Sequence, residues 1–335
     1  MAIQKISLNN FTVFNKLEIR LSEGINVFIG ENGTGKTHLL KLLYTFCQAS
    51  VNCAKSSWID KFTVLLNNNF FSSFNTLSNQ TEIRINDEIV YDHKLNEIKP
   101  ISSRHESDTI TEAGYENFTY VFIPAKETLS MSNITRIHDK FSKELDIDNT
   151  LIDIIKQAQN IKPDKIPDLA KIITPKLEEV MDGTIFVKTD NNTFWVRKND
   201  GREIPFTLEA EGFRKLGLLW QLLMNESITK DTILFWDEPE ANINPKIIPI
   251  VVELLLELTR HGVQIFVATH DYFFANFLEV RKNKDDRVLY HGLHKSDDGS
   301  GILCESQNHF KFLEKNSIIE QSINLYKEEV KKVMD

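Results

Sequence analysis

Cysteine is scarce in this sequence, and its spacing excludes two roles. The three cysteines, Cys47, Cys53 and Cys304, form no CxxC pair, and no histidine stands at zinc-ligand spacing from them. Neither a disulfide framework nor a zinc site is therefore expected. Reduced thiols that pack as small apolar side chains are the expected state.

Apolar runs long enough to cross a membrane are missing as well. The N-terminal MAIQKISLNN has no apolar signal core, and the run IIPIVVELLLEL at 247–258 contains Glu253 and Glu257. A bilayer span needs about 20 consecutive apolar residues. We expect a soluble, cytoplasmic protein with no membrane partner.

Basic charge is in deficit, with 39 Lys and Arg residues against 48 Asp and Glu residues and a formal net charge of −9. A global basic field for nucleic acid is therefore absent, so nucleic-acid binding would need a local patch. The densest basic segment is interrupted by Asp285 and Asp286, which favours a solvated loop. Its basic residues are Arg281, Lys282, Lys284, Arg287, His291, His294 and Lys295.

Internal repeats, low-complexity tracts and sustained heptads are also absent, so a long coiled coil is not expected. What the chain does have is length and apolar content: 335 residues, 41% of them hydrophobic. That is enough to bury the core of one large domain or of two coupled lobes.

Apolar periodicity predicts the secondary structure of the first two thirds. Strands are expected at 3–8, 16–21 and 25–30, followed by a helix at 38–49. Further on, the pattern predicts a hairpin at 81–93 with its turn at Asn86-Asp87, and a buried strand at 118–125. A helical region is expected at 131–182, punctuated by Pro163, Pro167 and Pro175. A second hairpin is expected at 184–197, across Asp190, Asn191 and Asn192.

The last third alternates helices with apolar strands. Helices are expected at 211–225 and 245–260, and strands at 232–238 and 263–270. Such alternation predicts parallel strands joined by helical crossovers. The expected fold class is therefore α/β with a mostly parallel core sheet.

A phosphate-binding motif follows the strand at 25–30. Residues 30–37, GENGTGKT, fit GxxxxGK[ST] without a mismatch, and a helix follows. Glycines let successive backbone N–H groups face a phosphate, and the helix N-terminus adds positive potential. A glycine-rich turn with a chance lysine is the alternative, which the flanking strand and helix disfavour. The expected ATP-binding residues are Gly30, Glu31, Asn32, Gly33, Thr34, Gly35, Lys36, Thr37 and His38.

Two of these residues have chemical roles of their own. Lys36 is expected to reach the β- and γ-phosphates, and the Thr37 hydroxyl to bind Mg²⁺. ATP and Mg²⁺ are accordingly the expected substrate and cofactor.

Two adjacent carboxylates end the apolar strand TILFWDE. A buried parallel strand delivers its last residues to the ligand crevice, so Asp237 is expected to hold Mg²⁺ through water and Glu238 to polarise the attacking water. The alternative is a surface acidic turn, which is less favoured beside a phosphate cradle. A P-loop kinase would use the aspartate but has little need for the glutamate.

The next strand, VQIFVATH, ends at His270. A histidine at this edge can hydrogen-bond the γ-phosphate or the attacking water. Lone histidines are usually structural, but the position one crossover after the carboxylates favours a catalytic role.

Taken together, these motifs resemble those of RecF, SMC and OLD proteins, the ABC-type ATPases that do not transport. NNFTVFNKLEIRLSEGINVFIGENGTGKT, LEAEGFRKLGLLWQLL, DEPEANINP and ATHD follow in the family's order and cover about 1–45 and 203–280. The resemblance implies a P-loop NTPase of ABC-ATPase type with an antiparallel β subdomain and a helical insertion lobe. It also implies a homodimer or higher homo-oligomer, joined head to tail around ATP.

The resemblance assigns roles and a domain division. It implies Lys36, Glu238 and His270 as catalytic residues, Thr37 and Asp237 as metal ligands, and 240–245 as a loop that crosses the dimer interface. We expect one ATPase domain at 1–335, with 1–45 and 183–295 as the nucleotide-binding core, 46–182 as an inserted β-hairpin and helical lobe, and 296–335 as a C-terminal strand and helix.

The chain departs from the family at the signature loop, where a serine and two glycines are usual. Ala210, Glu211 and Gly212 stand there instead. A working trans site would need the acidic side chains turned aside, with the Gly212 amide and the Arg214 guanidinium facing the partner's phosphate. A plain helix start is the alternative, since acids stabilise helix N-termini. A glutamine of the family is also missing, and Lys126 and Glu127 are its possible replacements.

Three functions fit these observations. The first is a regulatory ATPase that controls a separate effector, a nuclease or toxin, in anti-phage defence; such heads occur in bacterial defence and toxin–antitoxin-like systems. The second is a RecF- or SMC-like ATPase for DNA handling or repair, which the acidic balance disfavours. The third is a nucleotide-binding module with negligible turnover, which the Asp237-Glu238 pair disfavours. Only 65 residues follow His270, so no nuclease domain is expected. Contacts with a partner protein are expected at 46–182 and at the C-terminal helix, 316–335.

Overall fold

The computed structural model describes residues 2–50, 65, 81–86, 88–92, 119–131, 148–188, 193–299 and 301–334. Its centre is a six-stranded sheet in the order β13-β12-β3-β11-β10-β6. All neighbouring strands are parallel except β13, which pairs antiparallel with β12 at one edge. The strands are β3 (Ile25–Gly30), β6 (Tyr120–Ile123), β10 (Ile233–Asp237), β11 (Gln264–Thr269), β12 (Val288–Lys295) and β13 (Ile302–Gln307).

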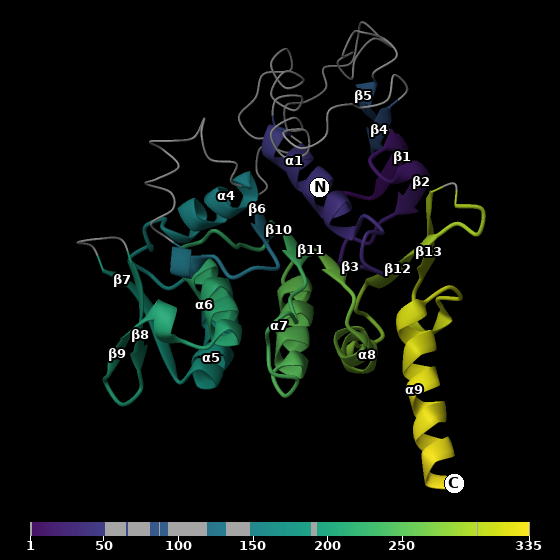
Figure 1. Ribbon diagram of the computed structural model, residues 1–335. Coiled ribbons are helices and arrows are strands. Elements are labelled where there is room, and N and C mark those ends of the chain that lie inside the picture. Colours follow the sequence, from purple (N-terminus) through teal and green to yellow (C-terminus); the bar gives the residue numbers. More distant parts are fainter. Residues whose placement is uncertain are drawn as a thin grey trace, which may run out of the picture.

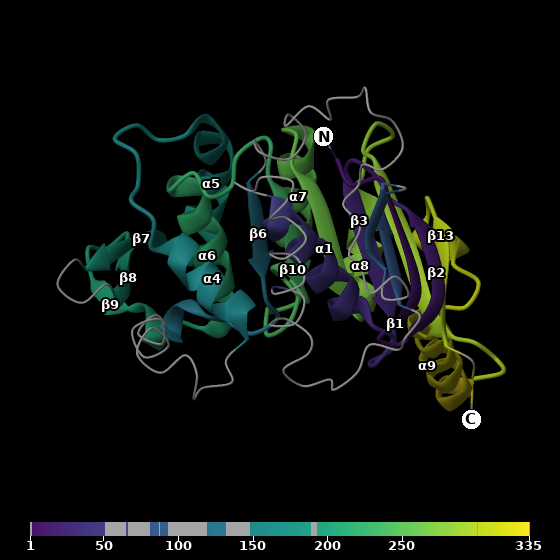
Figure 2. The same ribbon diagram turned by 90° about the horizontal axis from the view of Figure 1, so that it is seen from above.

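An antiparallel sheet, in the order β2-β1-β4-β5, lies over one face of this central sheet. Helix α1 (Lys36–Ser50) lies between the two sheets (Figures 1 and 2), and apolar side chains from both sheets and from α1 form one core. The four strands are β1 (Lys5–Phe11), β2 (Phe14–Arg20), β4 (Glu82–Ile85) and β5 (Glu88–Asp92). Burial on several sides explains why α1 has a nearly continuous apolar sequence after its first turn.

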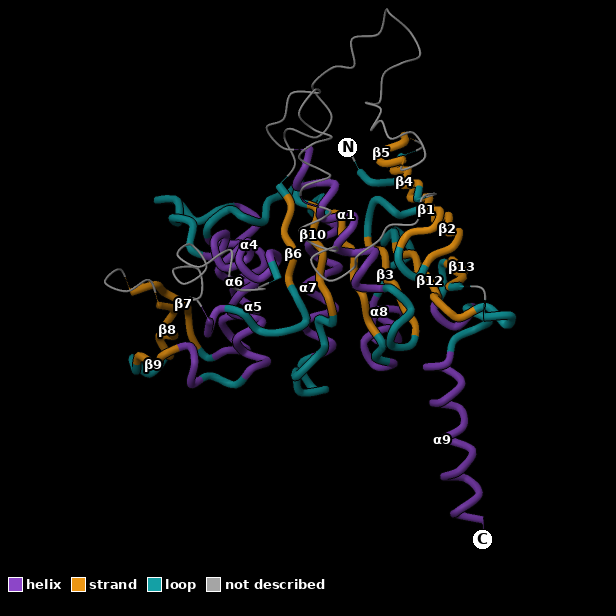
Figure 3. Tube along the Cα trace, turned by 45° about the horizontal axis from the view of Figure 1, so that its top comes forward, coloured by secondary structure: helices purple, strands orange, loops and turns teal. Residues whose placement is uncertain are grey.

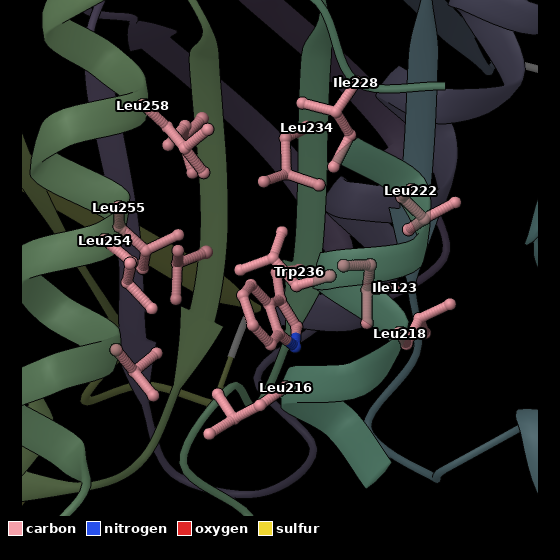
Figure 4. Close-up of a cluster of buried hydrophobic side chains, with 14 of the residues drawn as sticks. Ile123, Leu216, Leu218, Leu222, Ile228, Leu234, Trp236, Leu254, Leu255 and Leu258 are labelled. Carbon is pink, nitrogen blue, oxygen red and sulfur yellow. The ribbon is translucent and has the colours of Figure 1, made fainter. Parts of the chain in front are cut away.

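The opposite face of the central sheet is covered by helices (Figure 1). These are α6 (Glu211–Met224), α7 (Ile248–Arg260) and α8 (Tyr272–Arg281), while α5 (Asp168–Met181) packs against α6 and α7. Figure 4 shows Trp236 of β10 among Leu216 and Leu218 of α6 and Leu254 and Leu255 of α7. Helix α6 is therefore held directly against the strand that ends in Asp237.

A small lobe lies beside β6, the last strand of the central sheet in the described part of the chain (Figure 2). It contains α4 (Asn149–Ala158), α5 and α6 with a three-stranded antiparallel sheet, β7 (Gly183–Lys188), β8 (Thr193–Lys198) and β9 (Glu203–Pro205). Short 3-10 turns at Leu129–Met131, Phe206–Leu208 and Phe310–Phe312 complete the described secondary structure.

Helix α9 (Ser317–Met334) projects from the body of the molecule at the end opposite this lobe (Figures 1 and 3). Ile318 and Ile319 in its first turn pack against the core, and no residue of the helix is buried. Beyond that turn, Ile323, Leu325 and Tyr326 are exposed. None of the described helices combines the length and the apolar character that a bilayer span requires.

The predicted fold class, an α/β P-loop domain with a mostly parallel core sheet and antiparallel strands, is confirmed. One expectation was wrong: the basic segment 281–295 is not one solvated loop. Its second half is strand β12, and His291 is 0% exposed. Residues 288–290 are apolar, and Val288, Tyr290 and Leu293 are buried as in an inner strand, a pattern that the charge density concealed.

The division into a core and an inserted lobe stays a prediction, and two strands of 46–182 bear on it. β6 pairs with β10 in the central sheet, and β4 pairs with β1. Both strands are therefore parts of the sheets around α1. Most of 51–118 lies outside the described residues, as does 132–147.

Candidate nucleotide-binding site

The phosphate-binding motif forms a tight turn between β3 and α1. Gly33 and Gly35 have φ values of +81° and +86°, which other residues rarely adopt. A Cβ at Gly35 would lie 2.5 Å from the Phe14 ring, and one at Gly30 would lie 2.3 Å from the Leu293 carbonyl oxygen. Backbone conformation therefore favours glycine at position 33, close packing requires it at position 30, and both reasons apply to Gly35.

Lys36 is folded back along this turn. Its side-chain Nζ donates to the carbonyl oxygens of Gly30 and Glu31 at 2.7 and 2.9 Å. Burial lowers the pKa of Lys36, an effect that the nearby carboxylates of Glu238 and Asp237 oppose. The ammonium therefore lies against the turn that is predicted to bind phosphate.

The turn and the acidic strand end are joined by a direct hydrogen bond. The Thr37 hydroxyl donates to Asp237 Oδ2 at 2.9 Å, across 200 residues of sequence. Asp237 is only 8% exposed, and burial raises its pKa while the bond from Thr37 opposes that rise. A hydroxyl and a carboxylate are hard oxygen donors that fit Mg²⁺, which usually takes its other ligands from water and phosphates. The donor set therefore fits the ion that the sequence predicts.

Glu238 follows β10 with an unusual backbone. Its φ is +46°, and its N–H donates to the Ala268 carbonyl of β11. This turn directs the side chain toward His270, whose Nδ1 lies 2.8 Å from Glu238 Oε1. With Nδ1 protonated, the imidazole donates to the carboxylate and holds its orientation.

The loop after Glu238 is tied to the next strand. Glu240 accepts a hydrogen bond from the Thr269 hydroxyl at 2.6 Å, and its other oxygen, Oε2, is buried without a hydrogen-bond partner. Burial raises the pKa of Glu240 to about 7. Asp271, next to His270, caps α8 by accepting from the Phe274 N–H.

The acidic residues of the signature region are turned aside into pairs within the chain. Glu209 forms an ion pair with Lys198 at 2.8 Å, and Glu211 accepts from the Asn242 side chain at 2.8 Å. Gly212 lies against the 240–245 loop, because a Cβ there would be 3.1 Å from the Asn242 carbonyl oxygen. The N-terminus of α6 and this loop therefore form one surface.

Arg214 has a partner in its own chain. Its Nη1 lies 3.3 Å from Glu127 Oε2, and Glu127 also accepts from the N–H and the hydroxyl of Ser130. The side chain of Arg214 is 19% exposed. A contact from Arg214 to a second molecule's phosphate stays a prediction and requires this ion pair to open.

The predicted residues therefore fall into two groups. Residues 30–37, Asp237, Glu238 and His270 meet at the carboxyl ends of β3, β10 and β11, while Gly212 and Arg214 lie on α6. His38, one residue beyond the cradle, is half-buried on α1, and burial lowers its pKa. Sequence reasoning missed Lys198 as the partner of Glu209; no local pattern marks a pair between β8 and the start of α6.

A cavity of about 440 Å³ lies elsewhere, at the amino ends of the parallel strands. Gly24, Asp231 and Gln264 are among its lining residues. Ligands of open α/β sheets bind at the carboxyl ends of the strands. The chemistry described above is at that opposite edge, so we place the candidate site there.

Comparisons with known proteins agree with this geometry. A RecF DNA replication and repair protein of Cytophaga hutchinsonii is 41% identical over 73 residues, 22% of this chain and 19% of that protein. An energy-coupling factor transporter ATP-binding protein EcfA2 of Mesomycoplasma hyopneumoniae is 29% identical over 133 residues, 38% of this chain and 39% of that protein. The chain thus spans well under half the length of these relatives.

Among solved structures, an SMC head bound to the C-terminal winged-helix domain of ScpA has a TM-score of 0.50. It is 13% identical, and the alignment covers 93% of this chain and 99% of that one. Fold and motifs together define a P-loop domain of the ABC-type, RecF/SMC-like class. The chain belongs to the family described as "AAA domain, putative AbiEii toxin, Type IV TA system", whose profile matches residues 71–276.

Proposed function

We propose that the protein binds ATP with Mg²⁺ and hydrolyses it. One observation carries the proposal: the Thr37–Asp237 hydrogen bond, which joins the phosphate cradle to the acidic strand end. The neighbouring Glu238–His270 contact supports hydrolysis rather than binding alone.

Each residue has a distinct task in this proposal. The backbone N–H groups of 30–37 and the Lys36 ammonium bind the β- and γ-phosphates. Thr37 and Asp237 would hold Mg²⁺, which would supply positive charge to neutralise the phosphates. Glu238 accepts a proton from the attacking water, and His270 fixes the orientation of the Glu238 carboxylate.

We further propose that two copies associate head to tail around ATP. The Gly212 end of α6 and the 240–245 loop form one surface, which would face the partner's nucleotide. The pairing of Glu209 with Lys198 supports this proposal, because it neutralises a carboxylate that would otherwise repel a phosphate.

The test combines molar mass with turnover. Light scattering of Glu238→Gln with Mg²⁺ should show a mass that doubles when ATP is added, and Glu238→Gln should lack the turnover of the wild type. A mass independent of ATP together with normal turnover would reject the proposal. Arg214→Ala separately tests the proposed contact of Arg214 with the partner's phosphate. Intact turnover and intact ATP-driven dimerisation in this variant would show that Arg214 makes no such contact.

The biological role that we propose is control of a separate effector, a nuclease or toxin, in anti-phage defence, in the cytoplasm. The family description, which names a toxin–antitoxin system, supports this role. Exposed apolar side chains on α9 are a candidate contact surface. An effector that co-purifies with the full chain but not after deletion of 317–335 would support docking on α9. Retention of the effector after that deletion would exclude it.

Similarity to RecF proteins favours one second candidate, an ATPase that acts on DNA. The two candidates differ in a simple assay. Double-stranded DNA should stimulate the ATP turnover of a DNA-handling enzyme at about 0.1 M salt and leave that of an effector-controlling subunit unchanged.

A further inference from the structure

Lys215 has a fully buried cationic side chain that the mechanism above does not use. It lies on α6, one residue after Arg214, and is 1% exposed. Its Nζ donates to the backbone carbonyl oxygen of Glu238 at 3.0 Å. A buried ammonium requires compensating partners: burial lowers the pKa of Lys215, and the charges of Glu240, Glu211, Glu238 and Asp237 oppose that shift.

The carbonyl that Lys215 contacts belongs to a residue with an uncommon backbone. A non-glycine residue at a φ of +46° costs about 1 kcal/mol or more and persists only where its surroundings impose it. Here the Glu238 N–H is fixed by Ala268, and the Glu238 carbonyl accepts from the Ala241 N–H at 3.1 Å and from Lys215. Lys215 is the only one of these three partners that comes from outside the strands and their loop.

We propose that Lys215 is a positioning residue, which holds the Glu238 peptide so that its carboxylate faces His270 and the phosphate cradle. The proposal rests on the proposed ATPase function. Because Lys215 lies one turn along α6 from Gly212, the helix end that would meet the partner's nucleotide is rigidly connected to the chain's own Glu238. Docking of a second copy on α6 would thereby affect the position of Glu238, and so the rate of ATP hydrolysis, in the first copy.

The experiment compares Lys215→Met with a matched lysine. Lys162 is half-buried and lies in the small lobe. Its Nζ donates to the backbone carbonyl oxygen of Ile185 at 3.1 Å. Lys162→Met therefore removes a similar bond, together with a contact to the Trp220 ring on α6, and leaves the hydrogen bonds of Glu238 in place. For both variants, the quantities to measure are kcat, the affinity for a fluorescent ATP analogue, and the thermal unfolding midpoint.

We expect Lys215→Met to lower kcat about 10- to 100-fold, the usual effect of a misplaced catalytic group, with ATP affinity within about threefold of the wild type. Lys162→Met should keep wild-type kcat per folded molecule. Lys215→Arg retains a donor and should recover part of the lost turnover. Equal kcat in the two methionine variants would overturn the proposal.

Two further comparisons separate the possible failures. If Lys215→Met does not fold, Lys215→Arg and Lys215→Gln are measured instead, and wild-type kcat in both would overturn the proposal. If Glu238→Gln retains turnover, the ATPase mechanism itself fails. If Glu238→Gln abolishes turnover while the Lys215 variants keep it, only the role of Lys215 fails.

Discussion

Glu240 offers a sharp test of the electrostatics around the site. Its side chain is 8% exposed and accepts one hydrogen bond, from Thr269, and burial raises its pKa from 4.5 to about 7. The charged groups near it act in opposite directions: Asp271 raises this pKa further, and His270 lowers it.

The sign and size of the effect on stability follow from the pKa. The folded state binds the proton more tightly than the unfolded state, so Glu240 contributes no penalty below pH 4.5 and an increasing one as pH rises toward 7. A pKa change from 4.5 to about 7 corresponds to about 3 kcal/mol, since each unit is worth about 1.4 kcal/mol. Glu240→Gln removes this titration and retains an acceptor for Thr269.

The assay is urea unfolding of both proteins at pH 5 and pH 8. Relative to its own value at pH 5, Glu240→Gln should gain about 2 to 3 kcal/mol over the wild type at pH 8. All other titrating groups are shared and cancel in this double difference. Glu328→Gln, on exposed helix α9, is the control and should show no such gain. Parallel pH profiles for wild type and Glu240→Gln would refute the buried-carboxylate argument.

The remaining predictions concern the cradle and the core. Thr37→Ala loses the hydroxyl bound to Asp237 and should lower Mg²⁺-dependent ATP turnover about tenfold or more; unchanged activity across a Mg²⁺ titration would contradict the metal role. Gly35→Ala would place a Cβ 2.5 Å from the Phe14 ring at a φ of +86°, so the thermal midpoint and the binding of a fluorescent ATP analogue should both fall; a wild-type midpoint would show that the turn tolerates side chains. Leu219→Ala, at a position 0% exposed, should cost about 2–5 kcal/mol in urea unfolding, and a cost under about 1 kcal/mol would mean that α6 repacks freely.

Much of the site was predictable because its residues follow strand ends. The sequence placed 30–37, Asp237 and His270 each after an apolar strand, and parallel strands bring their carboxyl ends to one edge. The structure unites these residues at that edge, with Thr37 and Asp237 in hydrogen-bond contact. The roles of the individual side chains stay predictions until turnover is measured.

The pairings around α6 were not predictable. Glu209 finds Lys198 on β8, and Arg214 finds Glu127 beyond β6. Each pair joins elements that local sequence treats as unrelated, so neither spacing nor periodicity could identify it. The same reason explains the error at 281–295, where charge density suggested a loop and long-range pairing with β3 made a strand.

The sequence alone determined the class of the protein, because a phosphate cradle and a strand that ends in two carboxylates need only local residues in a fixed order. Tertiary structure decided which charges are available for chemistry. Lys215, next to Arg214 in the sequence, is directed inward to the Glu238 carbonyl, and Arg214 turns to Glu127. Neighbours on a helix point about 100° apart, and only the packing of α6 against β10 and the lobe fixes which partner each one meets.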